Sequence, residues 1–302
     1  MFTDSTGKLK PVWATVFSLI LCGLAFFVSG NIAHEVTEQH PFRVEFAFRP
    51  LWMLLLLGIF FWLLTVADHI DHQRLAAMGL PRTKGFVKHF LVGCIIGFLL
   101  TSLAVAPIHF WGHFRSTDLF TVRLIPNIGA VVLTLLCGAL AEELMFRGYP
   151  FQHLVQGIGA VRAVVVFSIL YGLLHLQNPA PGRWGIADTI LIGVLLSVAC
   201  LRTQALWLPW GIHFGWNLTL GVLFGLPVSG YRFYNVIRYT DAKGPLWVTG
   251  GRYGVEASAT GAVVILLGIL LVWKLPLGKL PQPASAATPE PALRDTLSGI
   301  KP

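Results

Sequence analysis

The sequence has little charge for its length. Only 12% of its 302 residues are Asp, Glu, Lys or Arg, whereas 55% are hydrophobic. A soluble domain of this length would carry far more charge on its surface. The scarcity of charge therefore indicates a protein whose main solvent is lipid.

Cysteine is also scarce, and its placement is informative. The four cysteines lie in four different apolar stretches, where a thiol behaves as a small hydrophobic group; they are Cys22, Cys94, Cys137 and Cys200. Such spacing implies neither a disulfide framework nor a zinc cage built from thiolates.

Several common catalytic motifs are missing. The chain has no GxSxG serine-hydrolase motif, no GxxxxGK[ST] phosphate-binding loop and no helical HExxH zinc motif. The segment HEVTEQH at residues 34–40 separates its two histidines by six positions, so they would lie on different helical faces, and we interpret it as an external loop. The segment DHIDHQR at residues 68–74 is interpreted as a solvated helix end.

The chain contains several long apolar stretches. A helix needs about 20 apolar residues to cross a bilayer. Eight windows approach this length, at residues 12–30, 51–67, 88–110, 124–141, 161–177, 186–203, 206–226 and 258–275. The first is too long for a signal-peptide core and is predicted to stay as an anchor. The sequence thus predicts an all-α fold, a polytopic integral membrane bundle with about eight transmembrane helices.

The basic residues indicate an orientation. Of the 22 Lys and Arg residues, 13 lie in segments on the same side as the N-terminus and nine on the opposite side. This bias favours cytoplasmic N- and C-termini, and the short loops favour a bacterial inner membrane. The net charge of +8 is scattered through those loops, so we expect contact with membrane lipids and predict no nucleic-acid partner.

One membrane domain is predicted for residues 1–276, with its motif-bearing core at about 125–225, and residues 277–302 form a Pro- and Ala-rich tail that we expect to be disordered. The longest connection, residues 227–257, is rich in glycine. Its glycines predict tight backbone turns, and Glu256 is placed to cap or enter the last helix. The alternative is a solvated connector.

Two carboxylates and a guanidinium follow the fourth apolar window, in AEELMFRGY at residues 141–149. One ionised residue at mid-bilayer costs about 2.5 to 3.5 kcal/mol, so these groups need partners or water. Glu143 and Arg147 are four apart and suit an intrahelical pair, whereas Glu142 projects about 100° around the helix and is comparatively free. In the simpler alternative the helix ends here and all three side chains face lipid headgroups.

Two further windows carry polar pairs at helical spacing. Tyr171 and His175 share a face in YGLLH, and His213 and Asn217 share one in HFGWN. A single histidine in a membrane helix commonly has a structural role, in which it forms a hydrogen bond to a neighbouring helix. Together with Glu142, these side chains are more consistent with a shared polar site.

A turn is predicted at Gly157-Ile158-Gly159, and its position allows the membrane depths of residues in the two flanking windows to be compared. If the fourth and fifth windows form an antiparallel hairpin about this turn, Glu142 and His175 lie at the same level. Pro150 could kink this path.

The residue types suit hydrolysis by activated water. A carboxylate in a partly desolvated pocket can act as a general base, and histidine and asparagine can donate hydrogen bonds to an oxyanion. Alternatively, Glu142, His175 and His213 could bind a divalent metal such as zinc, and Asn217 could contact these ligands without binding the metal itself.

The three motifs, in this order, resemble those of a known family. EELMFR resembles EExxxR, YGLLH resembles FxxxH with Tyr171 in place of Phe, and HFGWN resembles HxxxN. These motifs are typical of the CAAX-protease and bacteriocin-processing family of intramembrane endopeptidases, which is related to the type II CAAX prenyl endopeptidase.

The resemblance implies a helical bundle with a water-accessible cavity. It implies that Glu142 activates water with help from His175, that His213 and Asn217 hold the oxyanion, and that Glu143, Arg147 and Tyr171 support the site. We favour the metal-free mechanism, with no required cofactor. Tyr171 keeps an aromatic ring but adds a hydroxyl group.

The resulting hypothesis is an intramembrane endopeptidase that hydrolyses a membrane-associated peptide or protein. One alternative is a non-catalytic membrane scaffold or bacteriocin-immunity protein of the same family. Another is a proton-coupled transporter, although the chain has no repeated halves and no matching pair of broken helices. The sequence makes no prediction about oligomeric state.

Overall fold

The structure is a computed structural model, and it describes residues 10, 12–13, 15–20, 23–24, 58, 79–82, 84–121, 125–232 and 235–280. Most of the first two apolar windows, the segments 34–40 and 68–74, and the tail from residue 281 lie outside this part. The elements are α3 (Phe86–Val105), α4 (Ile108–Trp111), β1 (His113–Asp118), α5 (Ile125–Arg147), α6 (Tyr149–Ile158), α7 (Ala160–Leu174), η3 (His175–Gln177), α8 (Gly182–Thr203), α9 (Trp207–Asn217), η4 (Leu218–Leu223), β2 (Arg238–Lys243), α10 (Leu246–Thr249), η5 (Val255–Ala257) and α11 (Ala259–Lys274).

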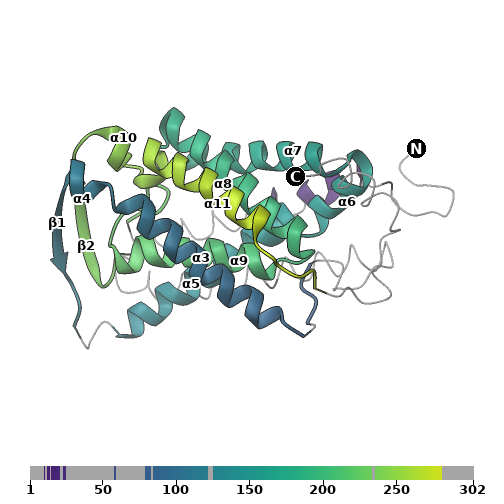
Figure 1. Cartoon of the computed structure of the whole chain (residues 1–302), viewed down its shortest axis with the longest axis horizontal. Helices are drawn as coiled ribbons and strands as arrows, with labels where there is room; N and C mark the ends of the chain where they lie inside the picture. The colour runs from purple at the N-terminus through teal and green to yellow at the C-terminus, as the bar shows by residue number, and fades with distance from the viewer. Residues whose placement is uncertain are drawn as a thin grey trace.

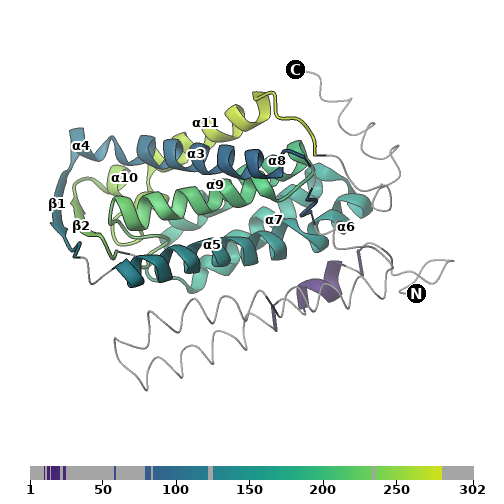
Figure 2. The same cartoon turned by 90° about the horizontal axis from the view of Figure 1, so that it is seen from below.

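The long helices run side by side, and a two-stranded sheet lies at one end of them (Figures 1 and 2). Strands β1 and β2 pair antiparallel, from His113 opposite Lys243 to Asp118 opposite Arg238. We call this end of the bundle the sheet end, and the opposite end, where α6 lies, the α6 end.

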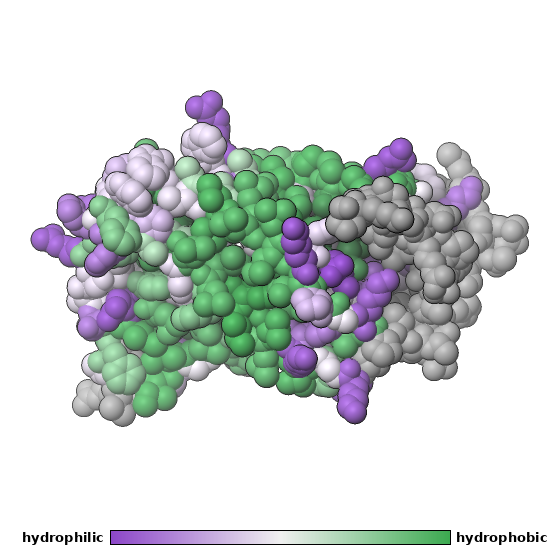
Figure 3. Space-filling model, in the orientation of Figure 1, coloured by the Kyte–Doolittle hydropathy of each residue, from purple (hydrophilic) through white to green (hydrophobic). Residues whose placement is uncertain are grey.

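Four helical stretches are long and apolar enough to cross a membrane, at residues 86–111, 125–158, 160–177 and 182–203, and a shorter apolar helix spans Ala259–Lys274. The space-filling view shows a broad hydrophobic band between polar ends (Figure 3). The chain is therefore an integral membrane protein that is mostly helical. Six of the eight predicted windows coincide with described helices, and the count of eight transmembrane helices stays a prediction.

Exposed aromatic side chains gather near the sheet end. Phe110, Trp111, Trp184 and Trp247 are all exposed, and the rings of Trp111 and Trp247 lie 5.7 Å apart. Amphipathic aromatic rings favour the boundary between a bilayer and water. Their position indicates that the β1–β2 sheet lies at or beyond this boundary.

Helices α3 and α9 touch through their backbones. A Cβ atom on Gly97 would lie 2.3 Å from the carbonyl oxygen of Ile212, and one on Gly211 would lie 2.2 Å from that of Phe90. Gly93 and Gly215 are equally tight. Small residues four apart on both helices allow this approach, which is a common device in membranes. The contact fixes α9 on both sides of residue 213.

The predicted turn at residues 157–159 is confirmed, since α6 ends at Ile158, Gly159 has a positive φ of 87°, and α7 begins at Ala160. The simple hairpin is wrong, however. Helix α5 ends at Arg147, and Gly148 separates it from α6. The backbone is so close at this point that a Cβ atom on residue 148 would lie 2.3 Å from the carbonyl oxygen of Leu144, so glycine is required there. Helix α5 therefore does not run straight to the turn.

Residues 227–257 form a folded segment rather than a simple connector. The segment contains β2, α10 and η5, and it precedes α11. The N-cap of α11 is Ser258, whose side chain accepts a hydrogen bond from the backbone N–H of Gly261. Glu256 is therefore not the cap that we considered from the sequence. Its side chain is buried inside the protein instead.

Apolar side chains fill the space between α5 and the segment formed by α9 and η4. This cluster contains Val131, Leu135, Phe214 and Val222. It holds α5 against α9, so that the polar side chains of the two helices meet at a fixed distance.

Candidate active site

Glu143 and Arg147 form the intrahelical pair expected from their spacing. The Nη1 atom of Arg147 lies 3.2 Å from Oε1 of Glu143, and both side chains are fully buried. The Nη2 group of Arg147 donates a second hydrogen bond, at 3.2 Å, to the carbonyl oxygen of Gly193 on α8. The ion pair therefore also links α5 to α8.

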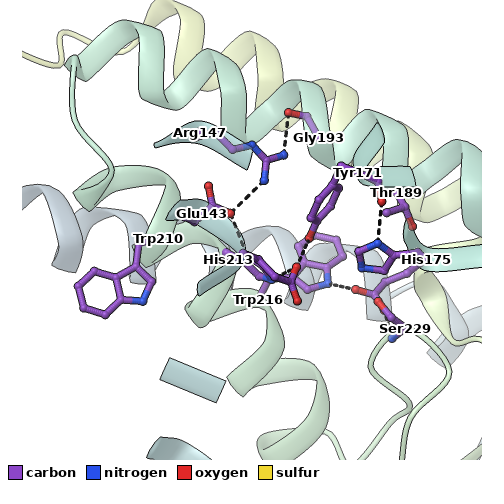
Figure 4. Close-up of polar contacts among 12 residues, drawn as sticks. Glu143, Arg147, Tyr171, His175, Thr189, Gly193, Trp210, His213, Trp216 and Ser229 are labelled. Atoms are coloured by element: carbon purple, nitrogen blue, oxygen red, sulfur yellow. Dashed lines mark hydrogen bonds and ion pairs between the residues drawn. The ribbon is translucent and has the colours of Figure 1, made fainter. Parts of the chain in front are cut away.

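His213 lies between the two carboxylates. Its Nδ1 atom is 2.9 Å from Oε1 of Glu143, and its Nε2 atom is 3.8 Å from Oε2 of Glu142. Because a carboxylate only accepts hydrogen bonds, the Nδ1 atom carries a proton. Figure 4 shows these contacts as a continuous chain from Gly193 through Arg147 and Glu143 to His213.

Glu142 is the more accessible of the two acids. Its side chain is 26% exposed, whereas that of Glu143 is 0% exposed. Its Oε2 atom accepts a hydrogen bond of 3.0 Å from the hydroxyl group of Tyr171 on α7. The sequence expectation of one structurally paired and one freer carboxylate agrees with this difference.

Tyr171 is surrounded by the other polar residues of the site. The Arg147 guanidinium carbon lies 4.5 Å from the centre of its ring, which is a cation–π distance. The His175 ring packs against it at 4.6 Å between centroids, and the His213 ring meets it edge-on at 6.4 Å. Tyr171 therefore connects residues of α5, α7 and α9.

His175 lies beside this group rather than in contact with Glu142. It follows the last residue of α7, and its Nδ1 atom is 2.8 Å from the carbonyl oxygen of Tyr171. Among the described residues it makes no hydrogen bond or ion pair with Glu142. Glu142 instead meets α7 at Tyr171, one turn earlier than the hairpin predicted, because the chain breaks at Gly148.

Asn217 is half-buried and is the last residue of α9, one turn after His213. Its side chain has no hydrogen bond within the described part of the chain. The structure thus brings Glu142, Glu143, Arg147, Tyr171 and His213 into direct contact. His175 packs on this group through Tyr171, and Asn217 lies one turn away.

A second buried carboxylate lies nearby and was missed as part of the site. Glu256 is 2% exposed. Its Oε1 atom accepts a hydrogen bond of 2.9 Å from the indole N–H of Trp216, and its Oε2 atom accepts from the backbone N–H and the hydroxyl group of Ser229. Trp216 follows His213 by three residues, so Glu256 connects the 227–257 segment to the helix that carries the site.

Burial dominates the titration of this second region. It raises the pKa of Glu256, although the hydrogen bonds from Ser229 and Trp216 and the charge of His213 act in the opposite direction. Burial also raises the pKa of Tyr253 to about 12, with a further contribution from the charge of Glu256. No local pattern predicts these contacts, because Glu256 is 40 positions from Trp216 in the chain.

The metal alternative needs three ligands close to one point. In the described part of the chain, no group of three His, Cys, Asp or Glu side chains is arranged to hold one metal ion. The metal dependence stays a prediction, and we derive no chemical step through a metal.

Comparison with known proteins agrees with the motif assignment. Residues 124–219 match the family model described as type II CAAX prenyl endopeptidase Rce1-like. This segment contains all three motifs, so the resemblance stated from the sequence is confirmed. An uncharacterized 24.3 kDa protein of Escherichia coli is 28% identical over 159 residues, which make up 50% of this chain and 67% of that protein. No solved structure matches the chain.

Proposed function

We propose that the protein is an intramembrane endopeptidase that hydrolyses a peptide bond in a membrane-associated peptide or protein. One observation carries the proposal. Glu142, a partly exposed carboxylate in an apolar helical bundle, lies 3.0 Å from a tyrosine hydroxyl group and 3.8 Å from a histidine nitrogen. The match to an endopeptidase family over residues 124–219 supports it.

In this proposal Glu142 is the general base. Its Oε2 atom is occupied by Tyr171, so its other carboxylate oxygen accepts a proton from water as the water attacks the substrate carbonyl. Glu142 then returns the proton to the leaving amine. No covalent intermediate with the enzyme is required.

His213 is proposed to stabilise the negative charge that develops on the substrate oxygen. With both glutamates ionised and Arg147 positive, a second proton on His213, in addition to the one on Nδ1, makes the group of four side chains electrically neutral. Neutrality is favoured in apolar surroundings. The Nε2–H group would then donate toward the side of Glu142, while Glu143 holds Nδ1 at 2.9 Å.

His175 and Asn217 have less direct roles in this proposal. The family resemblance assigns His175 to the activation of water, but its nearest partner here is Tyr171. We therefore propose that His175 acts on Glu142 through Tyr171 or on the bound peptide. Asn217, one turn from His213, is proposed as a second oxyanion donor that engages when substrate is present.

The protein is proposed to lie in a bacterial inner membrane with both termini in the cytoplasm. The β1–β2 sheet and the exposed tryptophans near it would then be on the outer side. Reporter fusions after residues 120 and 280 should respond oppositely, and equal signals from the two positions would contradict this orientation.

The decisive test is Glu142→Gln, which keeps the size of the side chain and an oxygen that can accept from Tyr171. Purified parent and variant proteins are incubated in detergent with peptides from membrane-protein segments, and the products are identified by mass spectrometry. We expect cleavage to fall by about 10²- to 10⁴-fold, the usual contribution of a general base. The exposed carboxyl group of Asp118 provides the control variant, Asp118→Asn.

Equal cleavage by the parent and Glu142→Gln would overturn the proposed role. If neither protein cleaves but both bind the same partner, the non-catalytic scaffold or immunity alternative is favoured. Proton-coupled uptake into reconstituted vesicles would favour the transporter alternative.

A further inference from the structure

We propose that Tyr171 is a positioning residue for the general base: its hydroxyl group holds one oxygen of Glu142, so that the other is presented to water. The inference rests on the proposed function. It concerns the position at which this chain departs from the family pattern, because Tyr171 stands where the motif has phenylalanine.

The geometry of the hydroxyl group is specific. The Tyr171 side chain is 3% exposed, and its oxygen lies 3.0 Å from Oε2 of Glu142. A tyrosine hydroxyl bound to a carboxylate is the donor, and such charge-assisted bonds are stronger than neutral ones. A phenylalanine at this position would leave that carboxylate oxygen without this donor.

The ring of Tyr171 is independently fixed. Arg147 lies over one face, His175 packs against it, and Phe146 meets it edge-on with centroids 5.1 Å apart. These contacts use the ring rather than the hydroxyl group. The hydroxyl group therefore has a defined position before substrate binds, and its removal should leave the packing in place.

Tyr171 is also the nearest polar side chain to Glu142. The charged and titratable groups around this carboxylate are Tyr171 from α7, His175 from η3, His213 from α9, and Glu143 and Arg147 from its own helix. His213 is 3.8 Å away, and Arg147 is already paired with Glu143, so Tyr171 makes the closest of these contacts with Glu142. The orientation of the carboxylate therefore depends on this hydroxyl group.

The test is a graded series at position 171: phenylalanine, tyrosine and 3-fluorotyrosine, whose hydroxyl group is a stronger donor. For Tyr171→Phe we expect kcat to fall about 10-fold with KM within twofold, since a hydrogen bond to a charged group is worth about 1.5 kcal/mol or more. The 3-fluorotyrosine variant, which keeps the donor, should retain a kcat close to that of the parent.

Tyr253→Phe is the matched control. Tyr253 is also a buried tyrosine, 1% exposed, but its hydroxyl group is 3.4 Å from Thr189 and does not contact Glu142. Its variant should leave kcat unchanged. If Tyr253→Phe lowers kcat as much as Tyr171→Phe does, or if Tyr171→Phe leaves kcat unchanged, the inference is overturned.

A second readout does not depend on activity. Infrared difference spectra between each protein and its Glu142→Gln counterpart isolate the carboxylate stretching bands of Glu142. The separation of these bands should change in the Tyr171→Phe background, because one carboxylate oxygen loses its donor, and should stay the same in the Tyr253→Phe background. A changed separation in proteins that cleave nothing would support the role of Tyr171 while the proposed function fails. An unchanged separation in proteins that cleave would do the opposite.

Discussion

Glu143 and Glu256 are both buried carboxylates close to His213, but the protein accommodates them differently. Glu143 is fully buried beside a cation and an imidazole, Arg147 and His213. Glu256 is 2% exposed and is held by neutral donors, the indole of Trp216 and two groups of Ser229. The first carboxylate is in direct contact with charged partners, whereas the second is in direct contact with neutral donors.

The difference has consequences for how each region responds to change. A charge pair removed from water is costly to break, because the remaining partner stays buried without compensation. A carboxylate held by neutral donors can instead take up a proton and stay in place. The region around Glu143 should therefore be sensitive to mutation, and the region around Glu256 should be sensitive to pH.

The largest expected effect is that of Arg147→Met. The variant leaves Glu143 buried without its cation, so we expect a loss of about 3 to 5 kcal/mol in the free energy of unfolding. Chemical unfolding in detergent micelles measures it. The double variant Glu143→Gln/Arg147→Met removes both charges and should recover more than half of the loss. A loss below about 1 kcal/mol in the single variant would contradict the comparison.

The second prediction concerns the pH dependence of stability at Glu256. Because burial raises its folded-state pKa, its stabilising contribution is fully present below the ordinary value of about 4.3 and is lost as the pH rises through the folded-state value. The stability of the parent relative to Glu256→Gln should fall by about 1.4 kcal/mol per pH unit between those values.

This difference is measured by unfolding both proteins across the pH range, so that contributions common to both cancel. Asp188 and Tyr253 also interact electrostatically with Glu256, as does His213, and all three are retained in both proteins. A stability difference that rises with pH would mean that the three hydrogen bonds outweigh burial.

The smallest effect is expected for the exposed ion pair on the sheet. The Nε atom of Arg238 lies 2.7 Å from Oδ1 of Asp118, and both side chains are largely in solvent. Asp118→Asn should change the free energy of unfolding by no more than about 1 kcal/mol, and the effect should disappear in high salt. A larger loss would mean that the sheet contributes to folding more than its exposure suggests.

The local part of the site could be predicted from the sequence because helix periodicity fixes it. Spacing alone predicted the pair of Glu143 with Arg147, and the motifs on α7 and α9 placed Tyr171 and His213 in the same neighbourhood. The turn at Gly159 followed from its residue types. Each of these features depends on residues within a few positions of one another.

Other features could not be predicted because they depend on packing between distant segments. The break at Gly148 shifts the partner of Glu142 from His175 to Tyr171, and no periodicity gives the angle between α5 and α6. The hydrogen bonds of Glu256 in η5 join it to Trp216 on α9 and to Ser229 near the start of the 227–257 segment. Those contacts exist only after the long connection has folded.

The glycine contact between α3 and α9 restricts how a polypeptide could approach the site from the bilayer. Backbone atoms of the two helices meet over two turns, at Gly93 and Gly97 on one side and Gly211 and Gly215 on the other. A transmembrane segment could pass between the two helices only if their main chains separated. A lateral route from the lipid to His213 therefore has to pass between another pair of helices. The contact between α3 and α9 is a closed side of the bundle.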